Sequence, residues 1–185
     1  LVTHDHFDHV GNAVDIVKKT GAILIAQPET VDRFKKDFEL TADRIIFGGF
    51  GMNIGGSAII EGTTITMTQA SHSSGTGTPT GYIIKLEDGT VIYHAGDTGI
   101  FDSMSLFGEL YRIDLALLPI GSVFTMDPGQ AAKALTLLKP KKVMPMHYKT
   151  FPILEQSADR FVELARKEAP EVEVIILEPG QEYAL

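Results

Sequence analysis

The sequence lacks cysteine and tryptophan entirely, and it contains no long apolar run. Without cysteine the chain can form no disulfide, no thiolate zinc ligand and no cysteine nucleophile, so any metal that it holds must bind histidine, aspartate or glutamate. No window approaches the roughly 18 consecutive apolar residues of a membrane-spanning helix. Cationic residues are also few, since 16 Lys and Arg stand against 24 Asp and Glu, for a formal net charge of −8. This balance gives no general attraction to nucleic acid or to an anionic membrane surface.

Length and composition indicate one globular domain. The chain has 185 residues, of which 44% are hydrophobic and 22% charged, close to the usual globular proportions. No linker, internal repeat or low-complexity tract divides it, so we predict a single domain over residues 1–185. The sequence begins on Leu1-Val2-Thr3, which is typical of the end of an apolar strand, and we therefore expect a domain truncated at its N-terminus. The absence of cysteine favours a cytoplasmic location.

Apolar periodicity predicts alternating helices and strands. The predicted helices cover residues 11–20, 28–38, 103–111, 128–138 and 155–167, and Asp127 is the expected N-cap of the fourth. The predicted strands cover residues 22–26, 45–47, 57–61, 63–69, 82–87, 90–94, 115–120, 142–146 and 172–177, with a two-residue turn at Asp88-Gly89. Strands clustered in the middle, with βα units at both ends, favour an α/β fold whose sheets are covered outside by helices.

The segment His4-Asp5-His6-Phe7-Asp8-His9 carries the densest chemistry in the chain. It holds three of the six histidines and two acids, directly after a predicted strand end. Imidazoles two residues apart in an extended loop, here His4 and His6, can face one metal, while Asp8 and His9 can turn to an adjacent one. An expression-tag remnant would not interleave acids with histidines, and a surface accident would not place the remaining acids and histidines at strand ends. Nitrogen and carboxylate donors in this pattern suit Zn, Mn or Fe.

Further candidate ligands follow other predicted strands. His72 lies after the strand that ends at residue 69, Asp97 after the one that ends near 94, and His147 after the one that ends near 146. Active sites are commonly assembled on loops at such strand ends, so we expect these side chains to meet the histidine-rich segment. His94 lies inside a strand and Asp5 points away from its neighbours. Both are expected to support the ligands rather than bind metal, with simple core packing as the alternative for His94.

Taken in order, His4-x-His6-x-Asp8-His9, His72, Asp97 and His147 resemble the metal-ligand motif of the metallo-β-lactamase superfamily. Five segments narrow the resemblance to the family of uncharacterised metal-dependent hydrolases related to the L-ascorbate-6-phosphate lactonase. These segments are Gly51-Met52-Asn53-Ile54-Gly55-Gly56, His72-Ser73-Ser74, Tyr93-His94-Ala95-Gly96-Asp97-Thr98-Gly99, Leu117-Leu118-Pro119-Ile120-Gly121 and Pro145-Met146-His147-Tyr148. The similarity runs over residues 1–185.

The resemblance implies a four-layer αββα sandwich with a dinuclear metal site, and with the N-terminal strands of the family missing. It implies that one metal, Zn or Mn, is bound by His4, His6 and His72, the other by Asp8, His9 and His147, and that Asp97 bridges them. The chain departs from the family pattern where Gly121-Ser122 stands in place of the usual Gly-Asp, and a Gly-His-Ser-like segment does not occur. Gly121 itself is expected to be an ordinary turn residue, and Gly96 to let the backbone approach a metal.

We therefore expect a metal-dependent hydrolase in which a hydroxide activated by two metals attacks a phosphodiester or a lactone-type ester of a small, phosphorylated molecule. Asp8 and Asp97 are the expected catalytic residues, orienting the water and accepting its proton. Two alternatives stay open. One is a glyoxalase II-like thioesterase, disfavoured because those enzymes have Thr-x-Gly where this chain has Ser73-Ser74-Gly75; the other is a metal-binding regulatory or scaffold module without catalysis. The sequence predicts no nucleic-acid or membrane partner and leaves a homo-oligomer open.

Overall fold

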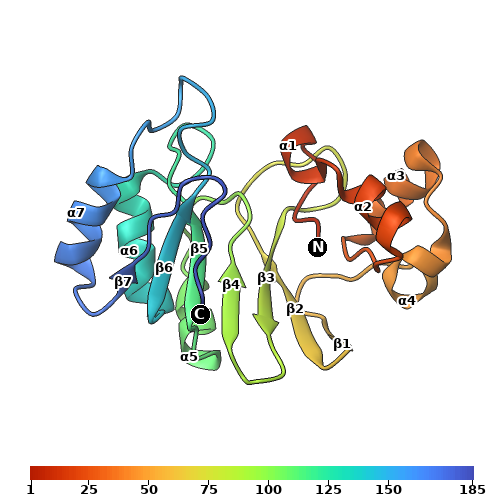
Figure 1. The fold of residues 1–185 in the computed structure, drawn as a ribbon, viewed down its shortest axis with the longest axis horizontal. Helices are drawn as coiled ribbons and strands as arrows, with labels where there is room; N and C mark the ends of the chain where they lie inside the picture. The colour runs from red at the N-terminus through yellow and green to blue at the C-terminus, as the bar shows by residue number, and fades with distance from the viewer.

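The computed structural model describes residues 1–185 and contains one mixed sheet of seven strands (Figure 1). The strands are β1 (Ser57–Ile60), β2 (Thr63–Gln69), β3 (Thr80–Lys85), β4 (Val91–His94), β5 (Leu115–Pro119), β6 (Lys142–Met146) and β7 (Glu173–Val174). They lie side by side in chain order; β1 to β4 pair antiparallel, and β4 to β7 pair parallel. Two antiparallel pairings separate β2 from β4, so β2 runs in the same direction as β4, β5 and β6. The carboxyl ends of these four strands therefore lie at one edge of the sheet.

Helices lie before, between and after the strands. They are α1 (Phe7–Val10), α2 (Ala13–Thr20), α3 (Pro28–Phe38), the 3₁₀ helix η1 (Ala42–Arg44), α4 (Ile46–Gly49), α5 (Met104–Leu110), α6 (Pro128–Leu138) and α7 (Asp159–Glu168). In Figure 1, α6 and α7 lie beside the parallel strands, and α2 to α4 lie at the opposite side of the molecule. None of these helices combines the length and apolar character that a membrane crossing requires.

Three clusters of buried apolar side chains give the fold its layers. The largest, of 21 buried residues, includes Tyr93 and Leu118 and joins one face of the sheet to α5, α6 and α7. A cluster of 7 residues, which includes Ile25 and Met67, lies between the strands β1 to β3 and the extended N-terminal segments. A third, of 10 residues, joins those segments to α2 and α3. The order of helices, sheet, extended segments and helices confirms the predicted αββα layering.

Extended segments form the second β layer in place of a full sheet. Leu24 belongs to the cluster under α2 and α3, whereas its neighbour Ile25 belongs to the cluster on the sheet, which is the alternation of a strand. The N–H of Val2 donates to the Ile25 carbonyl at 2.9 Å, and the N–H of Leu24 donates to the Arg44 carbonyl at 2.8 Å. Only Leu24 and Ile45 form a β-bridge. Of the strand predicted at residues 22–26, only this one bridge is therefore present.

The sequence-based boundaries agree with the structure for α3, α6, β2 and β6, and Asp127 caps α6 by accepting from the N–H of Gln130 at 2.8 Å. The strand predicted at residues 45–47 is wrong beyond its first residue, because α4 begins at Ile46 and Phe47 within it has a φ of 55°. The hairpin between β3 and β4 closes where the N–H of Leu86 donates to the Thr90 carbonyl, so its turn is one residue longer than predicted. The strand predicted at 172–177 pairs only over β7.

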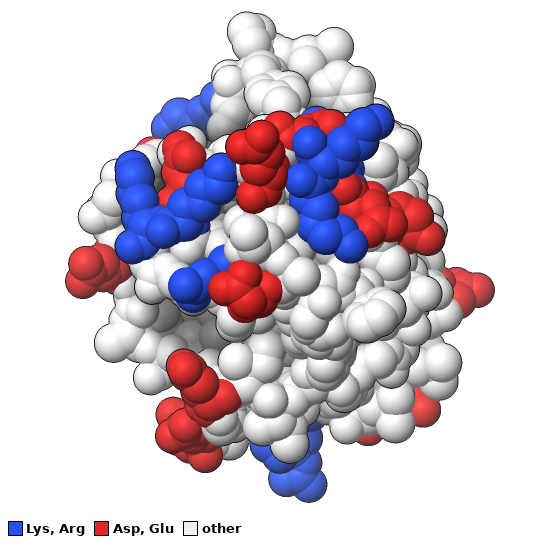
Figure 2. Space-filling model, turned by 90° about the vertical axis from the view of Figure 1, so that its right-hand side faces the viewer, with Lys and Arg blue, Asp and Glu red and all other residues white.

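The outer face of the N-terminal helices carries charges of both signs. Figure 2, which looks onto the right-hand side of Figure 1, shows Lys and Arg next to Asp and Glu over the upper part of this face. On α3, Lys35 lies 2.6 Å from Asp32 and Arg33 lies 3.4 Å from Asp37. Since the two signs neutralise each other locally, this face presents no continuous cationic surface.

Candidate metal centre

The predicted ligands meet at the edge of the sheet where β2, β4 and β6 end. His72 follows β2, Asp97 follows β4 and His147 follows β6, as the sequence predicted. The histidine-rich segment reaches the same edge because the Thr3 carbonyl accepts a hydrogen bond from the N–H of Thr80, at 2.9 Å, where β3 begins. The structure thus brings all seven predicted ligands into one place.

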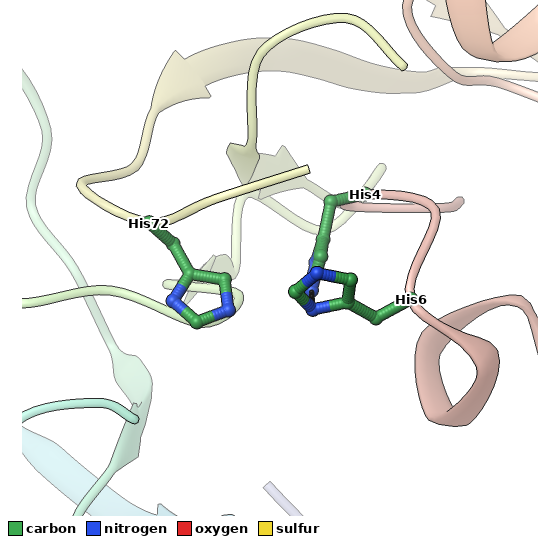
Figure 3. A group of neighbouring side chains, drawn as sticks. All are labelled: His4, His6 and His72. Carbon is green, nitrogen blue, oxygen red and sulfur yellow. Dashed lines mark hydrogen bonds between the residues drawn. The ribbon is translucent and has the colours of Figure 1, made fainter. Parts of the chain in front are cut away.

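The seven side chains form three overlapping groups, within each of which the donor atoms lie within 4.8 Å of one another. The groups are His4, His6 and His72; His4, His9 and Asp97; and Asp8, His9 and His147. Figure 3 shows the rings of the first group converging, His72 from the loop after β2 and the other two from the N-terminal segment. Nε2 of His4 lies 2.9 Å from Nδ1 of His6. Ring nitrogens that face one another so closely fit a shared cation.

Asp97 links these groups. Its Oδ2 lies 3.2 Å from Nε2 of both His9 and His147, and 3.7 Å from Nε2 of His72. Its other oxygen, Oδ1, is buried without a hydrogen-bond partner. A buried carboxylate oxygen without a partner is costly unless a cation or a donor satisfies it. The donor set, made only of imidazole nitrogens and carboxylate oxygens, therefore fits divalent cations such as Zn or Mn.

The pKa shifts in the centre follow from burial and from mutual contacts. Burial and the neighbouring His9 lower the pKa of His4 to about 3, and burial lowers the pKa of His72. The hydrogen bond to Asp97 raises the pKa of His147. Burial opposes ionisation of Asp97, but hydrogen bonds from His147 and His9 outweigh it and hold the pKa of Asp97 well below its usual value. Neutral His4 and His72 beside a charged Asp97 are the protonation states that metal binding requires.

Thr3 orients two of the rings, a role that sequence analysis missed. Its Oγ1 lies 3.1 Å from Nδ1 of His4 and 3.2 Å from Nδ1 of His9. The hydroxyl contacts both rings and so fixes their orientation, and a proton on each Nδ1 is the tautomer that would leave each Nε2 able to bind a cation. The signal in the sequence was the position of a hydroxyl side chain directly before the histidine-rich segment.

Asp5 holds the loop that carries His72. Its carboxylate is 3% exposed and lies 3.0 Å from the Arg33 guanidinium. It also accepts hydrogen bonds at 2.6–2.9 Å from Ser74 Oγ, the N–H of Gly75 and Thr76 Oγ1. Burial opposes ionisation, but the hydrogen bonds from Thr76, Gly75 and Ser74 prevail and lower the pKa of Asp5 to about 2. The structure thus gives Asp5 contacts with a loop next to a candidate ligand, and none with a ligand side chain.

His94 acts on the turn before Asp97. Its Nδ1 accepts a hydrogen bond from the N–H of Gly96 at 3.1 Å, and burial lowers the pKa of the ring. Gly96 has a φ of 63°, and a Cβ there would press on the Thr80 carbonyl and on the Thr3 side chain. The turn therefore needs glycine, because the protein's own chain approaches it closely.

Gly121 does more than turn the chain. A Cβ at this position would overlap the carbonyl oxygen of His147, so the loops after β5 and β6 can pack only with glycine here. His147 itself has a φ of 55°, a costly conformation for a residue with a side chain. The expectation of an ordinary turn residue missed this contact, because it depends on two loops that are distant in the sequence.

A pocket of about 630 Å³ opens over the centre. It is lined by His6, Phe7, Asp8, His72, Ser73, Asp97, Phe124, His147, Phe151 and Ile153. The volume suits a small molecule. No Lys or Arg is among the lining residues, so the phosphorylated substrate that the sequence suggested finds no cationic side chain there.

Comparisons with known proteins agree with this architecture. Residues 1–148 match the family model of the beta-lactamase superfamily domain. A UPF0173 metal-dependent hydrolase from Nitratidesulfovibrio vulgaris is 53% identical over 186 residues, which cover 100% of this chain and 77% of that protein. One from Pyrobaculum islandicum is 50% identical and covers 97% of this chain and 77% of its own length.

Solved structures give the same result. Igni18, a metallo hydrolase from the hyperthermophilic archaeon Ignicoccus hospitalis, has a TM-score of 0.85 and 42% identity, covering 97% of this chain and 76% of that one. YhfI from Bacillus subtilis, at 16% identity, has a TM-score of 0.72 over 97% of this chain and 74% of its own, which shows the fold alone.

The layered fold and the cluster of His and Asp at one sheet edge define a hydrolase of the metallo-β-lactamase fold. Within that class, the chain belongs to the UPF0173 family of metal-dependent hydrolases of the β-lactamase superfamily. The resemblance that the ligand motif indicated is confirmed.

Proposed function

We propose that this chain hydrolyses a phosphodiester or a lactone-type ester of a small molecule, using two divalent cations, Zn or Mn, held by its His and Asp cluster. The observation that carries the proposal is the position of Asp97, whose Oδ2 lies within 3.7 Å of Nε2 of three imidazoles from three separate segments. Seven donors are more than one four-coordinate zinc needs. Two cations that share Asp97 would use them all.

In this proposal the two cations occupy separate sets of side chains. One is held by His4, His6 and His72, the other by Asp8, His9 and His147, and Asp97 contacts both. The division is supported because the two sets share no residue, and because Asp97 lies close to members of each. When bound, two divalent cations lower the pKa of a water towards about 7 and polarise the scissile bond.

The two carboxylates take different parts. Asp97 is 4% exposed and contacts imidazoles on several sides, which suits holding the centre together and orienting the water. Asp8 is 32% exposed, lines the pocket, and has its Oδ2 3.6 Å from Nε2 of His147. A carboxylate at a pocket wall can accept a proton from a water that attacks the substrate. Asp8 is therefore the proposed proton acceptor.

The test compares metal-free protein with protein that is reloaded with Zn or Mn. Each form is assayed on bis-(p-nitrophenyl) phosphate, on a lactone and on a thioester. We expect turnover of the diester or the lactone only after reloading. Asp97→Asn should lower it by more than about 100-fold, the upper range for residues that only support a metal ligand. Asp102→Asn, on the exposed loop before α5, is the matched control and should retain activity.

The other outcomes separate the alternatives. Tight binding of metal without turnover of any ester would favour a metal-binding module without catalysis. Preference for the thioester would favour a thioesterase. Full activity of chelator-treated protein would contradict the proposed use of cations.

A further inference from the structure

Four large apolar side chains line the pocket beside the candidate ligands. They are Phe7, Phe124, Phe151 and Ile153, and they are 78%, 53%, 41% and 61% exposed. Exposed apolar side chains gathered around one pocket mark a contact site, whereas singly scattered ones are normal on a protein surface. We call these four residues the apolar collar.

The backbone holds the apolar collar in place. One of its residues begins α1, one lies in the loop after β5, and two lie in the loop after β6. The N–H of Glu155 donates to the Gly121 carbonyl at 3.1 Å, which joins the last two loops, and the N–H of Lys149 donates to the Glu155 carbonyl at 2.7 Å, which closes the loop after β6 on itself. Ser122 and Val123 have φ values of 63° and 40°, which persist only where the surroundings fix them. The backbone that carries Phe124, Phe151 and Ile153 is therefore fixed before a ligand binds, which lowers the free energy spent in ordering the site.

The pocket offers no positive side chain to a second anionic group. None of its lining residues is Lys or Arg, and its titratable side chains are all candidate ligands. Lys149 belongs to the loop after β6, but its ammonium lies 3.3 Å from the Glu178 carboxylate. A carboxylate or phosphate remote from the scissile bond would lose its water without gaining a counter-charge. An apolar group, in contrast, gains by burial against the apolar collar.

We infer that the substrate carries an aromatic or branched aliphatic group beside its scissile bond, packed against the apolar collar, and no second anionic group. This inference rests on the proposed function, because it takes the candidate ligands as the position of the scissile bond. The sequence led us to expect a phosphorylated substrate. We now infer an apolar ester, or a diester whose single charge lies at the reacting phosphorus.

The test uses methylphosphonate, benzylphosphonate and 4-carboxybenzylphosphonate, which differ only in the group beside the phosphonate. Their binding to the Zn-reloaded protein is measured by titration calorimetry, which does not depend on turnover. We expect benzylphosphonate to bind at least about tenfold more tightly than either of the others.

Variants of the apolar collar make the test specific. Phe124→Ala and Ile153→Ala should each weaken benzylphosphonate about three- to tenfold and leave methylphosphonate unchanged. Ile153→Lys should shift the preference towards the carboxybenzyl compound. Phe50→Ala, which removes a side chain that is 78% exposed and does not line the pocket, is the matched control.

Equal binding of the benzyl and carboxybenzyl compounds, or collar variants without effect, would overturn the inference. A dimer that dissociates on combining Phe124→Ala with Ile153→Ala, with phosphonate binding unchanged, would overturn it too and make the apolar collar an interface between two copies. Apolar preference in binding without hydrolysis of any ester would overturn the proposed function, and with it the inferred substrate, and would leave the apolar collar as a ligand-binding surface. Hydrolysis without that preference would overturn the inference alone and leave the proposed function standing.

Discussion

Oδ2 of Asp97 lies 3.2 Å from Nε2 of His147, although the two residues follow different strands of the sheet. Only β5 separates β4 from β6, and all three strands are parallel, so the loops after β4 and β6 leave the sheet at the same edge. The same oxygen lies 3.2 Å from Nε2 of His9, on the N-terminal segment. Because the Asp97 carboxylate contacts imidazoles from different segments, its removal should weaken the binding of every cation in the centre. Removal of an imidazole that belongs to one set should weaken the binding of one cation only.

Metal stoichiometry follows from this arrangement. The protein should bind two Zn or Mn ions per chain. His4→Ala and His147→Ala should each retain one ion, and Asp97→Ala should lower the affinity for both. Equilibrium dialysis with elemental analysis measures this, and circular dichroism checks that each variant is folded. One ion or fewer in the unaltered protein, or the loss of a single ion in all three variants, would contradict the dinuclear proposal.

Gly121→Ala should damage the centre without touching a ligand. The added Cβ overlaps the carbonyl of His147, so one of the two loops must move, and we expect metal affinity and activity to fall at least about tenfold. Gly99→Ala is the control, because a Cβ there would meet only the Ser71 carbonyl at an ordinary distance of 3.8 Å. Equal behaviour of the two variants would show that the contact has no importance for the site.

Asp5 should give stability a defined pH dependence. The pKa of Asp5 in the folded chain is lowered to about 2, below its unfolded value of about 3.9. Its stabilising contribution is therefore complete above about pH 4 and is lost as the pH falls towards 2. Asp5→Asn should lower the free energy of unfolding by about 2 kcal/mol at neutral pH. The difference from the unaltered protein, followed by urea unfolding at several pH values, should shrink between pH 4 and 2, while Asp15→Asn on exposed α2 should show no such trend. A difference that is constant with pH would refute this role.

His94→Gln separates support of the site from simple packing. The ring accepts the hydrogen bond of Gly96 next to Asp97, so we expect unchanged metal stoichiometry with metal affinity or activity about 10–100-fold lower. Calorimetric metal titration and the diester assay measure the two effects. If only thermal stability falls, His94 is a core residue, as the alternative interpretation of the sequence holds.

The fold was predictable where local signals are sufficient. Helix α6 has an Asp127 cap and Pro128 at its first turn, and β2 alternates threonine with apolar residues, so both elements are specified by their own sequence. The segment at residues 45–47 is apolar like a strand, but Gly48 and Gly49 after it permit a turn that no periodicity records. Whether such a segment pairs is decided by its neighbours in space.

The meeting of the candidate ligands was also largely predictable, because His and Asp side chains recur at the ends of several strands, where sites are commonly assembled on loops. The apolar collar was not. In the sequence, Phe124 and Ile153 are ordinary apolar residues, and only the fold shows that they face solvent beside the candidate ligands. Thr3 escaped notice for a similar reason, since its contact with His9 depends on the turn of the chain into α1.

The chain-order arrangement of the strands has a consequence for how the protein folds. Each strand pairs with the next in sequence, so the sheet can grow by short steps, whereas Thr3 joins Thr80 only by closing a long loop. The N-terminal segment should accordingly dock last and detach first. In native-state hydrogen exchange, the amides of Val2 and Thr80 should open at lower free energy than that of the buried Ala116 in β5, and added Zn should slow them most. The last step of folding and the assembly of the hydrolytic centre are then one event, so a newly made chain acquires its chemistry only when the sheet is already in place.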